Sequence, residues 1–506
     1  MSGLPAGWMT APLGEVADVQ LGKMLDRKRT EGTSLPYLRN INVRWGHIDV
    51  SDLLEMPFRD QELNRYAVQP GDVMVCEGGE PGRAAVWTRR DQGIKYQKAL
   101  HRVRVGGGLL PNWLVYQLHL DASSGRLSKQ FTGTTIGHLP REAIVEYELR
   151  LAPLPEQHRI VEAIESYFTR LDDAVETLER GQRNLKRYRA SVLKAAVEGR
   201  LVPTEADLAR AEGRDYEPAS VLLERILAER RRRWQEAGGR GTYREPVAPE
   251  TKDLAELPQG WRWATADTLA DLKGGITKGQ KRRSADILRE VPYLRVANVQ
   301  RGRLDLSVMK RILATEAEID DLRLHPGDVL FNEGGDRDKL GRGWVWNGEL
   351  PECIHQNHVF RARILTRDLN PKLLSWYGNT AGQQYFFEQG KQTTNLASIN
   401  LTKLRGLPVP IPPLAEQSRI VAETERLLSL ADEAELLANV SARRCARFRQ
   451  SILKWAFEGK LADQDPSDEP ASALLERIRS QTSASRQSAS DADVRSNDVR
   501  TLKNLR

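Results

Sequence analysis

The chain has 506 residues, of which 40% are hydrophobic, and it carries 76 Lys and Arg against 69 Asp and Glu, a formal net charge of +7. The length suggests about three domains, the composition excludes a wholly disordered chain, and the mildly basic balance is compatible with a nucleic-acid partner. Three scattered cysteines without CxxC spacing indicate neither a zinc site nor a disulfide framework, and no apolar run approaches the roughly 18 residues of a membrane helix. We expect a cytoplasmic protein without a signal peptide and without membrane contact.

Residues 1–155 are predicted to form a mixed α/β (α+β) domain. Short runs of β-type composition, such as LPYLRNINV at 35–43, are punctuated by Gly, Pro and Asn. PNWLVYQLHLDA at 111–122 has the pattern of a helix. The domain therefore combines short strands with at least one helix.

Residues 156–235 are predicted to be a helical spacer. From Glu156 to about Glu198, apolar or small residues recur every seven positions, and a second series is offset by three or four. A heptad pattern held over this length argues for a coiled coil, here a rod of roughly 65 Å at about 1.5 Å per residue. The first series is Ile164, Leu171, Leu178, Leu185 and Val192.

The stretch from 229 to 257 is basic and interrupted by Gly and Pro, which is typical of a linker, and we place the linker proper at 236–256. Residues 257–412 are predicted to be a second mixed domain, and 413–479 a second helical spacer with smaller residues at its heptad positions. Residues 480–506 are rich in Ser, Asp and Arg with few large apolar residues, which predicts a disordered tail.

The second half of the chain repeats the first. The recurring motifs are LPAGW (4–8) and LPQGW (257–261), QPGDV (69–73) and HPGDV (325–329), PLPEQHRIV (153–161) and PLAEQSRIV (413–421), and EPAS (217–220 and 469–472). Two copies at so long a period indicate a duplicated half-molecule rather than a solenoid. We expect the two long helices to pair antiparallel, with the alternative that each caps its own domain. Glu156, Gln157, Glu416 and Gln417 are expected to cap the helices or to fix their entry.

The sequence offers no constellation for bond-making chemistry. GGITKGQK at 274–281 resembles a phosphate-binding loop, but Gln280 stands where the lysine belongs. HQNH at 355–358 could suggest a metal site, but the first copy has QKAL there. The paired EGG segments at 77–79 and 333–335 are better explained as turns that present nearby charges than as acid/base groups. We therefore expect no catalytic residue and no metal site.

Basic and amide-bearing residues gather at equivalent places in the two mixed domains. Two basic loops are candidates for following DNA phosphates, whereas RNINVR, RVANVQR and two Thr-rich loops are candidates for reading base edges. The phosphate candidates are Arg27, Lys28, Arg29, Lys278, Lys281, Arg282 and Arg283. The base-reading candidates are Arg39, Asn40, Asn42, Arg44, Thr134, Thr135, His138, Arg295, Asn298, Gln300, Arg301, Lys391, Gln392, Thr393, Thr394 and Asn395. For each one taken singly, a solvated surface side chain or a turn hydrogen bond is the alternative.

Two variable domains that open with LPxGW, each followed by PLxEQxRIV at the start of a long helix, resemble the specificity subunits of type I restriction-modification systems over residues 4–478. The resemblance implies two target-recognition domains, each reading one half of a split, asymmetric site in double-stranded DNA. It implies that the paired helices set the half-site spacing and dock two modification (methyltransferase) subunits, with restriction subunits as further partners. It also implies a non-catalytic chain of a bacterium or archaeon with no cofactor of its own, since S-adenosylmethionine, ATP and Mg²⁺ act on the partner subunits.

Two other classes of function stay open. A self-contained enzyme that modifies or cuts DNA would need catalytic motifs that the sequence does not show. A coiled-coil adaptor that binds no nucleic acid would leave the paired basic loops unexplained. Neither the half-site sequences nor the spacer length follows from the sequence.

Overall fold

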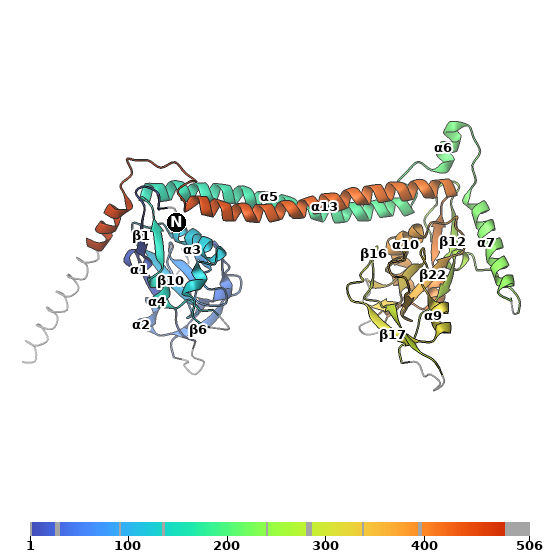
Figure 1. Ribbon diagram of the computed structural model, residues 1–506, viewed down its shortest axis with the longest axis horizontal. Helices are drawn as coiled ribbons and strands as arrows, with labels where there is room; N and C mark the ends of the chain where they lie inside the picture. The colour runs from blue at the N-terminus through green and yellow to red at the C-terminus, as the bar shows by residue number, and fades with distance from the viewer. Residues whose placement is uncertain are drawn as a thin grey trace, which may run out of the picture. The chain divides into compact units, whose positions relative to one another are not determined.

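The computed structural model describes residues 3–25, 31–90, 93–133, 137–238, 241–279, 286–335, 339–392 and 397–480. The chain divides into two compact units: unit 1 comprises 1–179 with 439–506, and unit 2 comprises 180–438. Each unit contains one mixed domain and one half of each long helix, α5 (Leu154–Val197) and α13 (Leu414–Ala456) (Figure 1). The two long helices expected from the heptad pattern are thus confirmed, and each helix is shared between the units.

The mixed domain of unit 1 consists of short strands and helices. Its strands are β1 (Met9–Pro12), β2 (Ala17–Leu21), β3 (Thr33–Leu38), β4 (Val43–Arg44), β5 (His47–Ile48), β6 (Leu54–Phe58), β7 (Val73–Cys76), β8 (Ala84–Val86), β9 (Lys95–Tyr96), β10 (Leu100–Val105) and β11 (Glu148–Leu151). Its helices are α1 (Leu13–Val16), α2 (Asp60–Leu63), α3 (Pro111–Ser123) and α4 (Arg141–Val145), with 3-10 turns η1 (Asn40–Asn42) and η2 (Leu127–Gln130). The helix α3 confirms the one expected at 111–122.

Unit 2 repeats this arrangement. Its strands are β12 (Arg262–Thr265), β13 (Ala270–Lys273), β14 (Arg289–Leu294), β15 (Val299–Gln300), β16 (Arg303–Leu304), β17 (Lys310–Ala314), β18 (Val329–Asn332), β19 (Gly334–Gly335), β20 (Gly343–Val345), β21 (Ile354–His355), β22 (Val359–Ile364), β23 (Lys391–Gln392), β24 (Ala397–Ser398) and β25 (Pro408–Ile411). Its helices are α6 (Glu205–Glu212), α7 (Ala219–Glu236), α8 (Ala266–Leu269), α9 (Glu316–Leu322), α10 (Pro371–Asn379), α11 (Gly382–Gln389) and α12 (Leu401–Arg405).

The sheets of the two units have matching strand orders. An antiparallel sheet runs β2-β10-β7-β8 in unit 1 and β13-β22-β18-β20 in unit 2. A second sheet runs β6-β3-β9 and β17-β14-β21, with the last strand parallel to the middle one in both cases. The duplication seen in the sequence is therefore a duplication of the fold.

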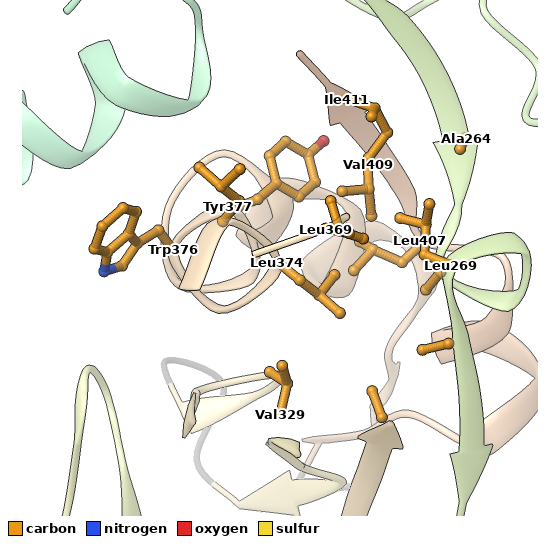
Figure 2. Packing of buried hydrophobic residues seen from close by; sticks show 14 of the residues in the cluster. Ala264, Leu269, Val329, Leu369, Leu374, Trp376, Tyr377, Leu407, Val409 and Ile411 are labelled. Carbon is orange, nitrogen blue, oxygen red and sulfur yellow. The ribbon is translucent and has the colours of Figure 1, made fainter. Parts of the chain in front are cut away.

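The hydrophobic core of unit 2 lies between the antiparallel sheet, α10 and the strand pair β12–β25. Figure 2 shows Leu369, Leu374 and Leu407 gathered between α10 and β12. The same cluster of buried side chains includes Val197 at the end of α5 and Ile420 near the start of α13. Both helix ends are thus part of the core of the domain rather than additions to its surface.

Charge explains why the two long helices run antiparallel within each unit. Over 154–179 α5 is rich in carboxylates, and over 180–197 it is basic and has no carboxylate. Over 414–438 α13 is acidic, and over 439–456 it is basic and again has no carboxylate. Antiparallel packing sets an acidic half beside a basic half in each unit, whereas parallel packing would set like charges side by side.

Ion pairs between the helices show this complementarity directly. In unit 2, Arg189 of α5 contacts Asp432 of α13, with 2.7 Å between guanidinium nitrogen and carboxylate oxygen. In unit 1, Arg449 of α13 forms an ion pair with Asp172 of α5. Arg449 and Asp432 are the repeat counterparts of Arg189 and Asp172. The same contact is therefore made once in each unit, with the roles of the two helices exchanged.

The predicted linker begins later than its composition suggested. ERRRRWQE belongs to the last turns of α7, which ends at Glu236. Glu229 pairs with Arg232 and Arg233, and Arg232 also pairs with Glu236, at spacings of three and four residues that stabilise a helix. The prediction of a linker from 229 is wrong for these eight residues. The predicted tail lies outside the described residues from 481 onward.

PLxEQxRIV anchors each long helix to its domain, as expected. In unit 2 the buried carboxylate of Glu416 accepts hydrogen bonds from the indole of Trp261 at 2.9 Å and the backbone N–H of Glu205 at 2.8 Å. The side chain of Gln417 donates to the carbonyl of Pro412 and accepts from the N–H of Asn370. The repeated residues of this motif therefore hold the start of the long helix against its domain.

This anchor predicts a pH effect on stability. Burial, opposed by the two hydrogen bonds, raises the pKa of Glu416, so the folded chain holds this proton more tightly than the unfolded chain. Stability should therefore fall as the pH rises from about 4.5 through the folded pKa, by at most about 1.4 kcal/mol per pH unit. Urea unfolding of Glu416→Gln against wild type should show a difference in stability that changes over this range. A difference that is constant with pH would contradict this assignment.

PGDV is a second structural motif. Gly327 has a φ of 95°, a conformation that favours glycine, and the turn brings the carboxylate of Asp328 back to the N–H of His325 at 2.7 Å. Both carboxylate oxygens of Asp328 also accept hydrogen bonds from Arg363, each at 2.8 Å. Asp72 makes the same bonds in unit 1, to Gln69 and Arg104. This ion pair ties the turn before β18 to β22.

Candidate nucleic-acid interface

One turn in each unit collects the segments that carry the candidate residues. In unit 1 it is the turn 97–99 between β9 and β10, and in unit 2 the turn 356–358 between β21 and β22. The N–H of Gln97 donates to the carbonyl of Leu38 at 3.1 Å, and the N–H of Gln356 to that of Leu294 at 2.9 Å. Because Leu38 and Leu294 directly precede RNINVR and RVANVQR, these segments start beside the turn.

The Glu-Gly-Gly segments join the same turn on another side. The N–H of Glu77 donates to the carbonyl of Ala99 at 2.9 Å, and its carbonyl accepts from the N–H of Leu139 at 2.8 Å. In unit 2, Glu333 makes the matching bonds to His358 and Ile399, at 3.0 and 2.8 Å. Each Glu-Gly-Gly segment therefore lies between the turn and the end of a Thr-rich loop.

Short antiparallel pairings flank both Thr-rich loops. Thr132 pairs with His138 in unit 1, and β23 pairs with β24 in unit 2, where β24 also pairs with Gly334 and Gly335 of β19. His138 is exposed and lies against Gly78, whereas Lys391 and Gln392 form β23. Thr134, Thr135, Thr393, Thr394 and Asn395 lie outside the described residues.

The basic loops leave from the same turn. The N–H of Lys23 donates to the carbonyl of Tyr96 at 3.1 Å, and that of Ile276 to the carbonyl of His355 at 2.8 Å. Lys278, two residues after Ile276, is exposed. Arg27, Lys28, Arg29, Lys281, Arg282 and Arg283 lie outside the described residues. All four kinds of candidate segment thus start or end around one turn in each unit.

Two of the base-reading candidates are corrected by the structure. Asn42 and Asn298 are each 2% exposed. The amide of Asn42 donates to the carbonyls of Asp49 and Asp52, and that of Asn298 to those of Asp305 and Val308. Their side-chain oxygens accept the N–H groups of the residues three positions earlier. Because these amides are buried and used inside the loop, the prediction that they read bases is wrong.

The other candidates in these segments differ in whether their side chains form hydrogen bonds within the loop or are exposed. Arg39 donates to Asp52 and Arg295 to the carbonyl of Val308, so both hold their own loop. Arg44 is exposed, and the amide of Asn40 donates to the carbonyl of Gly78 at 3.3 Å beside the Glu-Gly-Gly segment.

Gln300 and Arg301 form hydrogen bonds to other residues of unit 2. The amide of Gln300 donates to the carbonyl of Ala297 at 2.7 Å. The guanidinium of Arg301 donates to the carbonyl of Asn379 at 2.6 Å, at the end of α10. Arg301 therefore faces a different part of unit 2.

Sequence reasoning missed the turn itself. Lys98 is exposed, Asn357 is half-exposed, and exposed His358 forms a hydrogen bond with Glu333 through Nδ1. Lys98 and Asn357 occupy the same place in the two turns. The signal was present in HQNH, but its histidines suggested metal ligation rather than a loop centre.

The metal alternative for HQNH finds no support. His355 is fully buried, its Nδ1 lies 2.6 Å from the carbonyl oxygen of Val359, and burial lowers its pKa to about 4. Within the described residues, no group of three His, Cys, Asp or Glu side chains could hold a metal ion. A search of the same residues finds no helix long and apolar enough to cross a membrane.

Known proteins resemble this chain over nearly its whole length, although no family model matches it. The type I restriction enzyme EcoKI specificity subunit of Escherichia coli K12 is 24% identical over 507 residues, which cover 95% of this chain and 97% of that protein. The HsdS subunit from Thermoanaerobacter tengcongensis has a TM-score of 0.51 at 19% identity, covering 90% of this chain and 98% of that one. A chain solved in work on complex assembly and conformational transition of the type I R-M system has a TM-score of 0.57 at 21% identity, covering 91% and 100%. The resemblance indicated by the repeated motifs is confirmed.

Proposed function

We propose that this chain is the DNA-recognition subunit of a type I restriction-modification complex, in which each mixed domain reads one half of a split site. The observation that carries the proposal is that, in both units, an Arg/Asn segment, a Glu-Gly-Gly segment and the described residues that flank a basic loop and a Thr-rich loop converge on one turn. The frame that holds these segments is the same in both units, while the exposed side chains differ. Such a pair of domains suits a site whose two halves have different sequences.

The long helices are proposed to set the half-site spacing and to dock two modification subunits, with restriction subunits as further partners. The equivalent Arg189–Asp432 and Arg449–Asp172 contacts, one in each unit, support this, because two identical subunits need two equivalent binding surfaces. We further propose that the chain itself is non-catalytic and works in the cytoplasm, with S-adenosylmethionine, ATP and Mg²⁺ bound by its partners.

The two other classes of function are less well supported. A self-contained enzyme is not favoured, because the relatives are named specificity subunits. An adaptor that binds no nucleic acid would not need exposed polar loops gathered at one turn in each domain.

A methylome tests the proposal. DNA from cells that express this chain with its modification subunit should carry a split, asymmetric adenine-methylated motif that is absent from cells without this chain. Single-molecule sequencing would report both half-sites and the spacer at once. Unchanged methylation, with the subunits shown to co-purify, would overturn the role in recognition.

Matched substitutions at the central turns test the reading surface. Asn357→Ala should reduce the preference for the correct base at one position of one half-site by about 5- to 150-fold, as read from methylation rates. The reason is that one good base contact discriminates by about 1–3 kcal/mol. Lys98→Ala, at the same place in unit 1, should act only on the other half-site. Methylation rates on duplexes with single-base changes in each half would separate the two. Equal losses across all sequences from either variant would show that these residues do not read bases.

A further inference from the structure

Unit 2 contains a cavity of about 800 Å³ that α10 and the two long helices help to line. Apolar side chains line it from five elements: Leu193 of α5, Trp344 of β20, Trp376 of α10, Phe387 of α11 and Leu428 of α13. Trp376 is buried and belongs to the same cluster as Leu374 and Val329, and Figure 2 shows its ring on the other side of α10 from these two side chains. A volume of this order suits a small ligand, not a DNA duplex.

Positively charged side chains also line this cavity. Lys186 and Lys194 of α5 and Arg301 all line it, and both lysines are exposed. The carboxylate that lines it, Asp432, is paired with Arg189 at 2.7 Å. Lys186 and Lys194 lie eight residues apart, about 12 Å along a helix, which is a span closer to a di- or triphosphate than to a single carboxylate. The first turn of α11, whose N–H groups favour anions, lines the cavity as well.

At the equivalent place in unit 1 the counterpart residues differ. Arg301 corresponds to Trp45, whose ring stacks on His119 at 4.4 Å between centroids. Trp344 corresponds to Ala85 in β8, and Lys186 to Ala446. The hollow that Trp45 and His119 line in unit 1 is about 330 Å³ and includes Glu80 among its lining residues. The cavity is therefore not required by the repeated frame.

We propose that this cavity of unit 2 binds a free nucleotide, with the base against Trp344 and Phe387 and the phosphates at Lys186, Lys194 and Arg301. An aromatic wall attracts any base through its ring face, and lysine and arginine supply the charge that phosphates need. The site is separate from the loops proposed to read DNA, and its failure would leave that proposal untouched.

Equilibrium dialysis of the full chain with ATP, adenosine or tripolyphosphate tests the site. ATP should bind saturably, and adenosine and tripolyphosphate should each bind at least tenfold more weakly, since each lacks half of the contacts. If adenosine bound as tightly as ATP, the cations would not contribute to binding. If tripolyphosphate bound as tightly as ATP, the aromatic side chains would not contribute. An absence of saturable ATP binding at millimolar concentration would overturn the proposal.

The repeat supplies matched variants. Lys194→Ala should weaken ATP binding at least tenfold, whereas Lys454→Ala, its counterpart in unit 1, should leave it unchanged. Trp344→Ala should also weaken binding, and unit 1 shows that this frame accepts alanine there. Equal effects of both lysine variants would place the nucleotide elsewhere. A single-stranded oligonucleotide that binds the cavity more than tenfold tighter than ATP would overturn the choice of a free nucleotide.

Discussion

Replacing Asp328 by alanine is expected to destabilise unit 2 by about 3 kcal/mol. The carboxylate is 1% exposed and accepts two hydrogen bonds from Arg363 and one from the N–H of His325. The substitution would leave the guanidinium of Arg363 half-buried and without its carboxylate. Because that side chain is still 28% exposed, we place the loss at the lower end of the usual range for broken buried pairs. For a unit of this size the thermal midpoint should fall by about 6–12 °C in calorimetry of the full chain.

Two controls make this result specific. Asp72→Ala removes the same bonds from unit 1, so it should lower the transition of unit 1 and leave that of unit 2 in place. Asp328→Asn keeps an acceptor for the N–H of His325 but loses the charge, so it should recover part of the stability. A loss below about 1 kcal/mol for Asp328→Ala would mean that the pair does not hold the turn to β22.

The duplicated frame could be predicted from the sequence because the motifs that repeat are those that build it. LPxGW, PGDV and PLxEQxRIV each combine a glycine or proline at a turn with a side chain that is buried in the fold. Gly260, with a φ of 90°, turns the chain so that Trp261 is buried against the start of α13. Each of these residues has one structural role, and the same residue type fills that role in both halves of the chain.

The residues that read DNA could be predicted only in part. Asparagine and arginine side chains can either form hydrogen bonds within their own loop or contact a ligand such as DNA. Asn42 and Arg44 stand two residues apart in RNINVR, yet the first closes its loop from inside and the second is exposed. Alternation along a strand cannot settle this, since Asn42 lies in a 3-10 turn. The central turn was missed for a different reason: its place depends on β9 lying parallel to β3, a pairing between distant segments.

The antiparallel helices could have been predicted with more confidence from their charges than from their heptads. A heptad pattern is satisfied by either orientation, whereas the acidic first halves and basic second halves of α5 and α13 favour only one. The same pattern implies that the pairing weakens as salt rises, because these charges lie near the surface. Arg189, which contacts both Asp432 and Glu435 at 2.7 Å, is a strong single contact within unit 2.

The double substitution Arg282→Ala with Arg283→Ala is expected to lower DNA affinity by about 30-fold near 0.15 M salt for all sequences alike. Each phosphate contact contributes about 0.9 to the slope of log K against log salt, so the slope should become shallower by about 1.8. Half-site preference should be unchanged, because phosphate contacts carry no sequence information. Fluorescence anisotropy with a cognate and a scrambled duplex, from about 50 to 200 mM salt, measures all three quantities in the assembled complex.

Arg443→Ala with Arg444→Ala is the matched control, since it removes the same charge from an exposed part of α13. If the basic loop touches the backbone, only the loop variant should change the slope, because the slope counts local counterion release rather than net charge. If both variants changed it equally, the overall field of the protein would be the cause, and the loop would lose its role. A changed half-site preference in the loop variant would instead make these arginines readers of bases, leaving the phosphates to Lys278 and Lys281.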